Sequence, residues 1–179
     1  MERAGAATEA KSETVPPMTF TEVLRANQSM VFSLAYHFLR DPSAAEEIAQ
    51  DVFLQLYRKL DDLESAAHVV FWLRKVTSNR CIDHVRKRGS RTTVSLEDAA
   101  EPSIAEKQGD PLLNRRLRQL LATLPEKPRM VMVLRYQEDL TPDEIAALLE
   151  MPVRTVKSHL QRSLAMLREK IERSMGDIR

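Results

Sequence analysis

Cysteine, glycine and aromatic residues are all scarce in this chain of 179 residues. It contains one cysteine, four glycines and only 5% aromatic residues. One cysteine excludes an intramolecular disulfide framework and a cysteine-based metal cluster. Few glycines and aromatics argue against a β-sandwich or a Rossmann sheet. The abundance of Leu, Ala, Glu, Arg and Lys instead favours an all-helical fold, and a hydrophobic content of 43% is enough for globular cores.

Long apolar runs and enzyme motifs are also missing. No run is long enough to span a membrane, and the first 17 residues lack the hydrophobic core of a signal peptide. We therefore predict a cytoplasmic location. The sequence has no Walker loop, GxGxxG motif, metal-ligand cluster or nucleophile elbow, and its four histidines lie far apart. These absences predict a protein that is not an enzyme and that needs no cofactor and no metal.

Charge is nearly balanced overall but unevenly distributed. The net charge is +1, yet residues 74–91 hold seven basic residues against one acid, Asp83. Residues 97–110 reverse the sign, with the acids Glu97, Asp98, Glu101, Glu106 and Asp110 against Lys107. Local potential, rather than total charge, attracts a polyanion. The basic block is therefore a candidate nucleic-acid contact.

Hydrophobic periodicity predicts two small helical domains joined by a flexible linker. We expect helices over residues 20–39, 44–59 and 69–88, with a loop over 60–68, and further helices over 111–123 and 128–137. Cys81 falls on an apolar helix face and is expected to be buried, and Tyr57 is expected to face the core. The predicted boundaries are a disordered tail (1–17), a first domain (18–88), an acidic flexible linker (89–110) and a second domain (111–174).

Residues 139–168 have the pattern of a helix-turn-helix. Thr141 and Glu144 have capping-box spacing, and Pro142 occupies the first helical position. Pro152 ends this helix, and a second helix begins near Val153. Its predicted apolar stripe is Val156, Leu160, Leu164 and Leu167. The opposite face carries side chains that can bind base edges and phosphates in a major groove: Arg154, Thr155, Lys157, Ser158, Gln161 and Arg162.

Three segments, in this order, resemble one family. They are SAAEEIAQDVFL (43–54), FWLRKVTSNRCIDHVRKR (71–88) and LPEKPR (124–129) leading to LRY (134–136). Together with the helix-turn-helix they resemble the extracytoplasmic-function (ECF) sigma factors, minimal members of the sigma-70 family of transcription initiation factors. The resemblance covers about residues 20–172. It implies a factor that binds core RNA polymerase, recognises −10 and −35 promoter elements and promotes DNA melting.

The resemblance also implies roles for individual residues. The first domain would correspond to region 2 of the sigma-70 family. It would bind the clamp helices of the polymerase largest subunit through Glu46, Glu47, Gln50 and Asp51. Promoter contact and melting near the −10 element would involve Asn79, Arg74, Lys75, Arg80, Arg86, Lys87 and Arg88, with the loop 63–70 helping to capture a flipped base. The second domain would correspond to region 4 and would read the −35 element through the six residues on the polar face of the second helix of the helix-turn-helix. An anti-sigma factor is an expected further partner, and the free protein is expected to be a monomer.

Two residues depart from the family pattern. Arg154 and Glu150 stand where the family often has glycine, in and before the second helix of the helix-turn-helix. A residue other than glycine held at positive φ costs roughly 1–2 kcal/mol. We therefore expect a strained or reshaped turn at Glu150. The family's usual −35 preference need not transfer unchanged to a chain with Arg154.

Other interpretations of the same residues stay open at this point. The acidic helix face and the acidic linker can be merely solvated, Asn79 can brace the surface, and Trp72 is expected in the core, with Phe71 undecided. For the whole chain, one alternative is a sigma-like decoy that binds an anti-sigma factor. Another is a dimeric helix-turn-helix regulator that binds duplex DNA without polymerase.

Overall fold

The computed structural model describes residues 19–89 and 119–176, and all its regular elements are helical. The first half contains α1 (Phe20–Leu39), α2 (Pro42–Lys59), the short 3₁₀ helix η1 (Leu60–Asp62) and α3 (Ala66–Gly89). The second half contains α5 (Glu126–Tyr136), α6 (Pro142–Leu149) and α7 (Val153–Gly176), preceded by helical residues 119–122. The predicted tail, nearly all of the predicted linker and residues 111–118 lie outside the described residues.

Side-chain caps define where several helices begin. Thr19 and Glu22 form a capping box at α1, and Thr141 and Glu144 form the predicted one at α6. The Asp41 carboxylate accepts a hydrogen bond from the Ala44 amide at the start of α2, at 3.1 Å. Each cap satisfies an amide that has no partner within its helix. The cap residues thus explain why these helix starts follow from the sequence.

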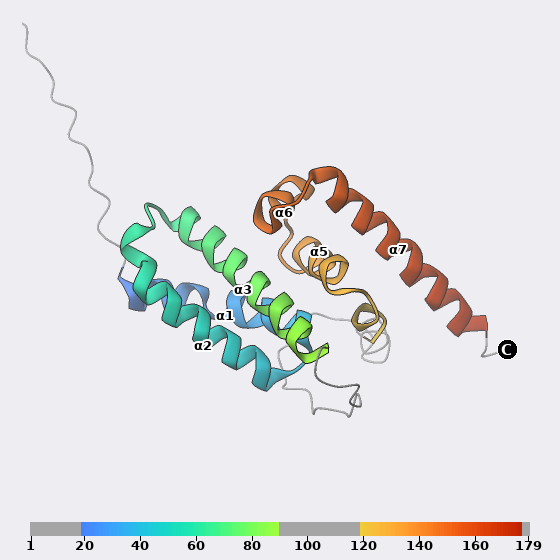
Figure 1. Ribbon diagram of the computed structural model, residues 1–179, viewed down its shortest axis with the longest axis horizontal. Helices are drawn as coiled ribbons and strands as arrows, with labels where there is room; N and C mark the ends of the chain where they lie inside the picture. Colours follow the sequence, from blue (N-terminus) through green and yellow to red (C-terminus); the bar gives the residue numbers. More distant parts are fainter. Residues whose placement is uncertain (1–18, 90–118, 177–179) are drawn as a thin grey trace, which may run out of the picture.

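The two halves of the chain pack against each other. Helices α1, α2 and α3 form a three-helix unit, and α5 lies against both α1 and α3, while α6 lies against α3 (Figure 1). Buried residues of both halves, such as Phe38, Leu73, Met130 and Ile145, belong to one continuous apolar core. The fold is therefore closed: the second half covers one side of α3.

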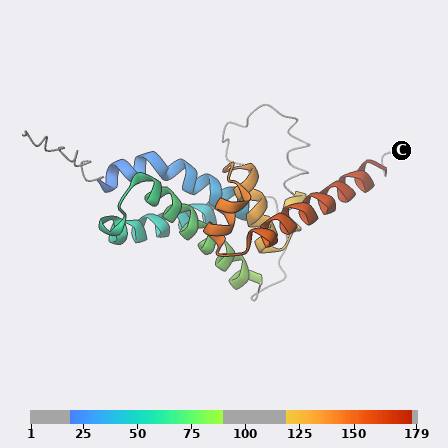
Figure 2. The same ribbon diagram turned by 90° about the horizontal axis from the view of Figure 1, so that it is seen from above.

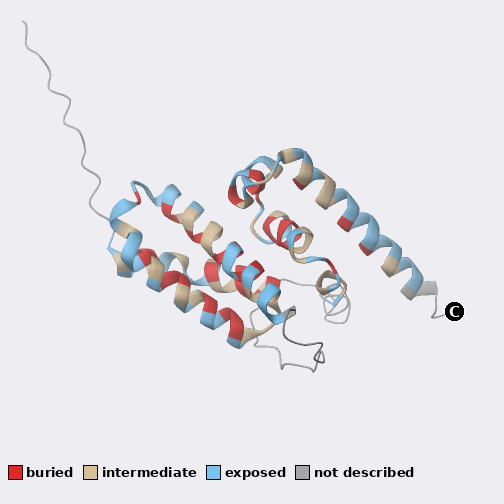
Figure 3. Cartoon of the chain, in the orientation of Figure 1, coloured by how far each residue is buried: buried red, intermediate tan, exposed pale blue. Residues whose placement is uncertain are grey.

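Burial follows the inner helix faces and thins out along α7 (Figure 3). The last turns of α7 extend past the other described helices (Figure 2). A small second cluster of Leu124, Met132 and Leu167 packs α7 onto the segment before α5. Among the described helices, none has the length and apolarity that crossing a membrane would require.

Three local expectations are corrected by the structure. The predicted loop over 60–68 is largely helical: η1 occupies its start, and α3 begins at Ala66, where the Ser65 hydroxyl accepts a hydrogen bond from the His68 amide. Tyr57, expected in the core, is 70% exposed because it lies at the edge of α2, with its ring against Phe20. Trp72 is only partly buried against the core.

The fourth correction concerns α7. Leu164 was expected in the apolar stripe but is exposed, while Ser163 is buried. At 100° per residue, Ser163 lies only about 20° from Val156 around the helix, whereas Leu164 lies about 80° from Val156. Angular position decided burial here, and residue type did not. The stripe is therefore Val156, Leu160, Ser163 and Leu167.

Candidate nucleic-acid and polymerase interface

The predicted recognition face lies on the first half of α7 and is open. Arg154, Lys157, Gln161 and Arg162 are exposed, and Thr155 and Ser158 are partly exposed. None of the six side chains makes a hydrogen bond or an ion pair with the described part of the chain. Their donors are therefore available to an external partner without breaking an internal bond.

The turn between α6 and α7 is built around a left-handed residue. Glu150 has φ 52° and ψ 47°, and its amide donates to the Ala146 carbonyl at the end of α6. This confirms the strained turn expected from the sequence, at a cost of about 1–2 kcal/mol relative to glycine. The left-handed residue reverses the chain direction and sets α7 across α6, as a helix-turn-helix requires.

The basic face of α3 is engaged almost completely. Five of its six predicted basic contact residues form ion pairs with carboxylates, with N–O distances from 2.6 to 3.2 Å. The pairs are Arg74–Glu138, Lys75–Glu150, Arg80–Asp51, Arg86–Glu126 and Arg88–Asp41. Lys87 is exposed and has no partner within the described residues. Residues predicted to hold phosphates thus hold protein carboxylates in this structure.

Three of these carboxylates come from the second half of the chain. Glu126 begins α5, Glu138 follows α5, and Glu150 is the left-handed residue of the helix-turn-helix. The pair between Arg74 and Glu138 is the most enclosed, with side chains 24% and 8% exposed. The contact between Lys75 and Glu150 is the shortest at 2.6 Å, although the Glu150 side chain is 71% exposed. These pairs join the two halves.

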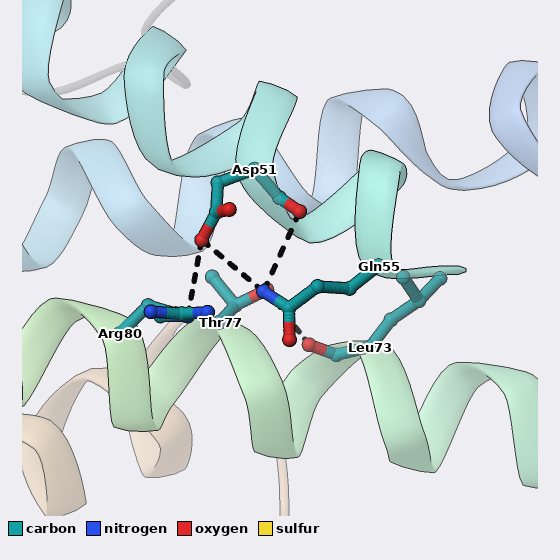
Figure 4. Close-up of polar contacts among 5 residues, drawn as sticks. All are labelled: Asp51, Gln55, Leu73, Thr77 and Arg80. Carbon is teal, nitrogen blue, oxygen red and sulfur yellow. Dashed lines mark hydrogen bonds and ion pairs between the residues drawn. The ribbon is translucent and has the colours of Figure 1, made fainter. Parts of the chain in front are cut away.

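The other two carboxylates come from α2 and its cap. Figure 4 shows Asp51 of α2 above α3, with one carboxylate oxygen 3.0 Å from Arg80 and 3.1 Å from the Gln55 amide nitrogen. Asp51 had been predicted to bind polymerase and Arg80 to bind DNA, and the structure joins them to each other. Asp41 pairs with Arg88, and its pKa is lowered, mainly by the hydrogen bond from the Ala44 amide and also by Arg88.

The remaining −10 candidates are exposed on α3. Asn79 is exposed and its side chain makes no hydrogen bond within the described residues, so the side-chain amide is free. Phe71, near the start of α3, is 40% exposed. Thr77 and Ser78, next to Asn79, are fully buried, and the Thr77 hydroxyl donates to the Leu73 carbonyl at 2.7 Å. Asn79 therefore projects from a helix segment that is firmly packed on its other side.

An apolar groove adjoins the acidic face of α2. Glu46 and Gln50 line one side of a groove of about 660 Å³ between α1 and α2, whose other walls are mostly apolar: Phe20, Leu24, Phe32, Ala49, Phe53 and Leu54. Glu47 is exposed nearby. The sequence analysis missed the α1 side of this groove. The sequence signal for it was a second apolar face on α1, with Phe20 and Phe32, that faces Ala49, Phe53 and Leu54 on α2.

Cys81 and His159 lie in environments that disfavour their charged forms. Burial raises the pKa of the Cys81 thiol to about 12, which confirms the expected buried structural cysteine. Partial burial and the nearby cations Arg162 and Lys127 lower the pKa of His159. His159 on α7 is therefore neutral at pH 7. Within residues 19–89 and 119–176, no group of three His, Cys, Asp or Glu side chains is arranged to hold a metal ion.

Comparisons with known families match both halves of the chain. The family model of Sigma-70 region 2 matches residues 23–91, and that of Sigma-70, region 4 matches residues 114–167. The first match contains most of α1 and all of α2 and α3, and the second contains α5, α6 and most of α7. The elements that carry the two basic faces thus fall in different family regions.

Whole-chain relatives agree with these matches. The chain is 32% identical over 157 residues to the RNA polymerase sigma-E factor of Streptomyces avermitilis, covering 87% of this chain and 86% of the relative. It is 27% identical over 165 residues to the ECF RNA polymerase sigma factor SigW of Bacillus subtilis, covering 85% and 88%.

Among solved structures, the sigma factor RpoE of Bartonella quintana in complex with the anti-sigma factor NepR has a similar fold. The TM-score is 0.70 at 21% identity, covering 86% of this chain and 96% of that one. With an all-helical fold, matches to both sigma-70 regions and a relative at 32% identity along most of its length, the chain belongs to the ECF sigma factors of the sigma-70 family.

Proposed function

We propose that this chain acts in the cytoplasm as a transcription initiation factor. It binds core RNA polymerase, directs it to promoters with −10 and −35 elements, and promotes melting of the DNA. The observation that carries the proposal is the open recognition face of α7, located in a chain that also matches Sigma-70 region 2 over residues 23–91. The α7 face can read a DNA sequence, and the region 2 match supplies the part of the chain that would bind the polymerase.

The −35 role is assigned to the first half of α7. Lys157 and Gln161 lie four residues apart and share one face of the helix, and Arg162 shares a neighbouring face with Ser158, four residues before it. Arginine and lysine can donate to guanine O6 and N7, and glutamine can pair with adenine. Arg154, Thr155 and Ser158 lie nearer the helix start, where they can contact phosphates or water-bridged bases.

The −10 and melting role is assigned to α3. Asn79 has the donor and acceptor needed to hold the Watson–Crick edge of a flipped base, and its amide is free. Arg74, Lys75, Arg80, Arg86, Lys87 and Arg88 then supply positive charge for the phosphates around it. In this state most of those cations first have to leave a carboxylate.

Polymerase binding is assigned to the face of α2 that carries Glu46, Glu47 and Gln50. Glu46 and Gln50 line an apolar groove, and this combination of acidic and apolar surface suits a basic amphipathic helix. Asp51 contributes less directly, because its carboxylate holds Arg80. The same groove is a candidate site for an anti-sigma factor. Support for such a partner comes from the solved structure of similar fold in which the sigma factor RpoE is in complex with the anti-sigma factor NepR.

The proposal also keeps the predicted domain boundaries: a tail over 1–17, region 2 over 18–88, an acidic linker over 89–110 and region 4 over 111–174. In this division the linker allows the two regions to separate on the polymerase surface. The long separation between −10 and −35 elements on DNA requires such a separation.

The test is in vitro transcription from a genomic promoter pool with core polymerase and this protein, followed by sequencing of RNA 5′ ends. Discrete starts that share two upstream motifs are the expected result. Core binding without discrete starts would contradict the proposal and favour a decoy. A stable dimer that protects duplex DNA without polymerase would favour a helix-turn-helix regulator instead. A triple Ala variant of Arg154, Lys157 and Arg162 serves as the control for sequence-specific starts.

A further inference from the structure

Three carboxylates of region 4 lie along one side of α3. Glu138 and Glu150 meet Arg74 and Lys75, and Glu126 meets Arg86. The two groups of contacts are about 17 Å apart along the α3 axis, given a rise of 1.5 Å per residue. Carboxylates spread over this length occupy positions along α3 that a run of DNA phosphates would otherwise take.

We infer that Glu138 and Glu150 form a latch that closes region 4 over the basic face of α3, and that DNA phosphates must displace it. The inference rests on the proposed function, because only a DNA-binding α3 gives the latch a consequence. The chemistry of the displacement is simple: one oxyanion replaces another on the same guanidinium and ammonium groups.

The backbone at Glu150 supports this assignment. Glutamate is a poor residue for the left-handed conformation that this turn requires, whereas glycine adopts it freely. A glycine here would offer no side chain to Lys75. The ion pair with Lys75, at 2.6 Å, explains why a glutamate occupies this left-handed position, which the helix-turn-helix fold alone does not explain.

Glu138 supports it independently. Its side chain is 8% exposed, and the Arg74 guanidinium donates to it at 2.9 Å from a different family region. Charged residues are seldom this enclosed unless they are paired. Asp139, which follows, also has positive φ, so the chain turns sharply directly after the contact. The turn between α5 and α6 therefore brings Glu138 to α3.

The ion pairs of the latch add to an apolar interface between the two halves. The shared core supplies affinity between the halves, whereas the ion pairs make the closed state sensitive to salt and to polyanions. An exposed pair shifts such an equilibrium by roughly two- to fivefold. The closed form leaves the recognition face of α7 free, so −35 contact is possible before α3 is released.

Small-angle X-ray scattering of the full chain tests the latch through a charge swap. Glu150→Lys places a cation against Lys75, and we expect the radius of gyration to rise. The double variant Lys75→Glu/Glu150→Lys restores the attraction, and we expect the radius to return to the wild-type value. Asp143→Lys makes the same charge change at an exposed α6 residue without a partner in the described chain, and it should stay compact.

An unchanged radius for Glu150→Lys, or a double variant as expanded as the single one, would overturn the latch. Glu138→Gln gives a second measurement, because raising NaCl from about 0.05 to 1 M shortens the Debye length to about 3 Å and should expand the wild type more than this variant. Circular dichroism verifies that each variant keeps its helices. Scattering needs no polymerase: if wild-type protein directs no transcription, the proposed function fails while the swap still decides the latch.

Discussion

The two basic faces of this sigma factor are in opposite states. The α7 face has six candidate contacts whose side chains form no bond within the described chain, whereas five of the six predicted basic contacts on α3 hold carboxylates. Both faces have the same chemistry, rich in Arg and Lys. What differs is which acids lie within reach once the chain folds. Availability for DNA is therefore a property of the packing, and residue type alone does not determine it.

The largest expected effect tests the open face. Replacing both Lys157 and Arg162 with alanine removes two donors that no internal acid competes for. Each base contact of this kind contributes about 1–3 kcal/mol, so the loss of both is expected to lower promoter-dependent transcription by roughly thirtyfold or more. The control is Arg168→Ala, an exposed cation further along α7. Equal losses in the two proteins would mean that general positive charge, and not this face, binds the promoter.

The second prediction tests the covered face through stability. Arg74→Ala leaves the enclosed Glu138 carboxylate without its partner, and we expect the free energy of unfolding to fall by about 1–3 kcal/mol. Lys87→Ala, on the same helix but unpaired, should change it by less than about 0.5 kcal/mol. Urea denaturation measures both. If the two variants were equally stable, the ion pair between Arg74 and Glu138 would make no measurable contribution to the free energy of unfolding.

The open face of α7 could be predicted from the sequence better than the ion-paired face of α3. The capping box at Thr141, the break at Pro152 and the polar face of α7 are local features, and the sequence pattern was sufficient for them. The engagement of α3 was missed because Glu126, Glu138 and Glu150 are 40 or more residues away from their partners. No spacing rule connects such residues, and only the packing of α5 and α6 on α3 brings them together.

The same limit explains the acidic face of α2. Helical periodicity placed Glu46, Glu47, Gln50 and Asp51 outside the core, and the structure agrees that they reach the surface. Periodicity could not separate Asp51, which pairs with Arg80, from Glu46 and Gln50, which border the groove. That distinction depends on how α2 and α3 cross, which is a tertiary property.

The third prediction separates the two roles of Glu150. Glu150→Gly and Glu150→Gln both remove the ion pair with Lys75, but only glycine relieves the left-handed backbone. We expect the glycine variant to be more stable than the glutamine variant by about 1 kcal/mol in urea denaturation, with equal loss of compactness. A glutamine variant as stable as the glycine variant would show that the turn is not strained, and the argument from backbone cost would fail.

The smallest expected effect concerns Asp41, whose ion pair with Arg88 lies wholly within region 2. Asn caps helices as well as Asp does, so Asp41→Asn keeps the cap and removes only the charge. Because the folded pKa of Asp41 is below its ordinary value of 3.8, its carboxylate stabilises the fold fully above that pH. This contribution is lost as the pH falls through the folded pKa, and solvent screening limits it to about 0.5 kcal/mol.

Wild type should therefore be slightly more stable than Asp41→Asn at neutral pH, and the difference should disappear on acidification below pH 3.8. Thermal unfolding of both proteins at a series of pH values measures this. A difference that persists in acid would assign the effect to the cap, whose geometry does not titrate. A difference that vanishes would assign the effect to the negative charge of Asp41, which both the Ala44 amide and Arg88 stabilise. That charge acts within region 2, so the pairs with Glu126, Glu138 and Glu150 remain the ones that link the basic face to closure.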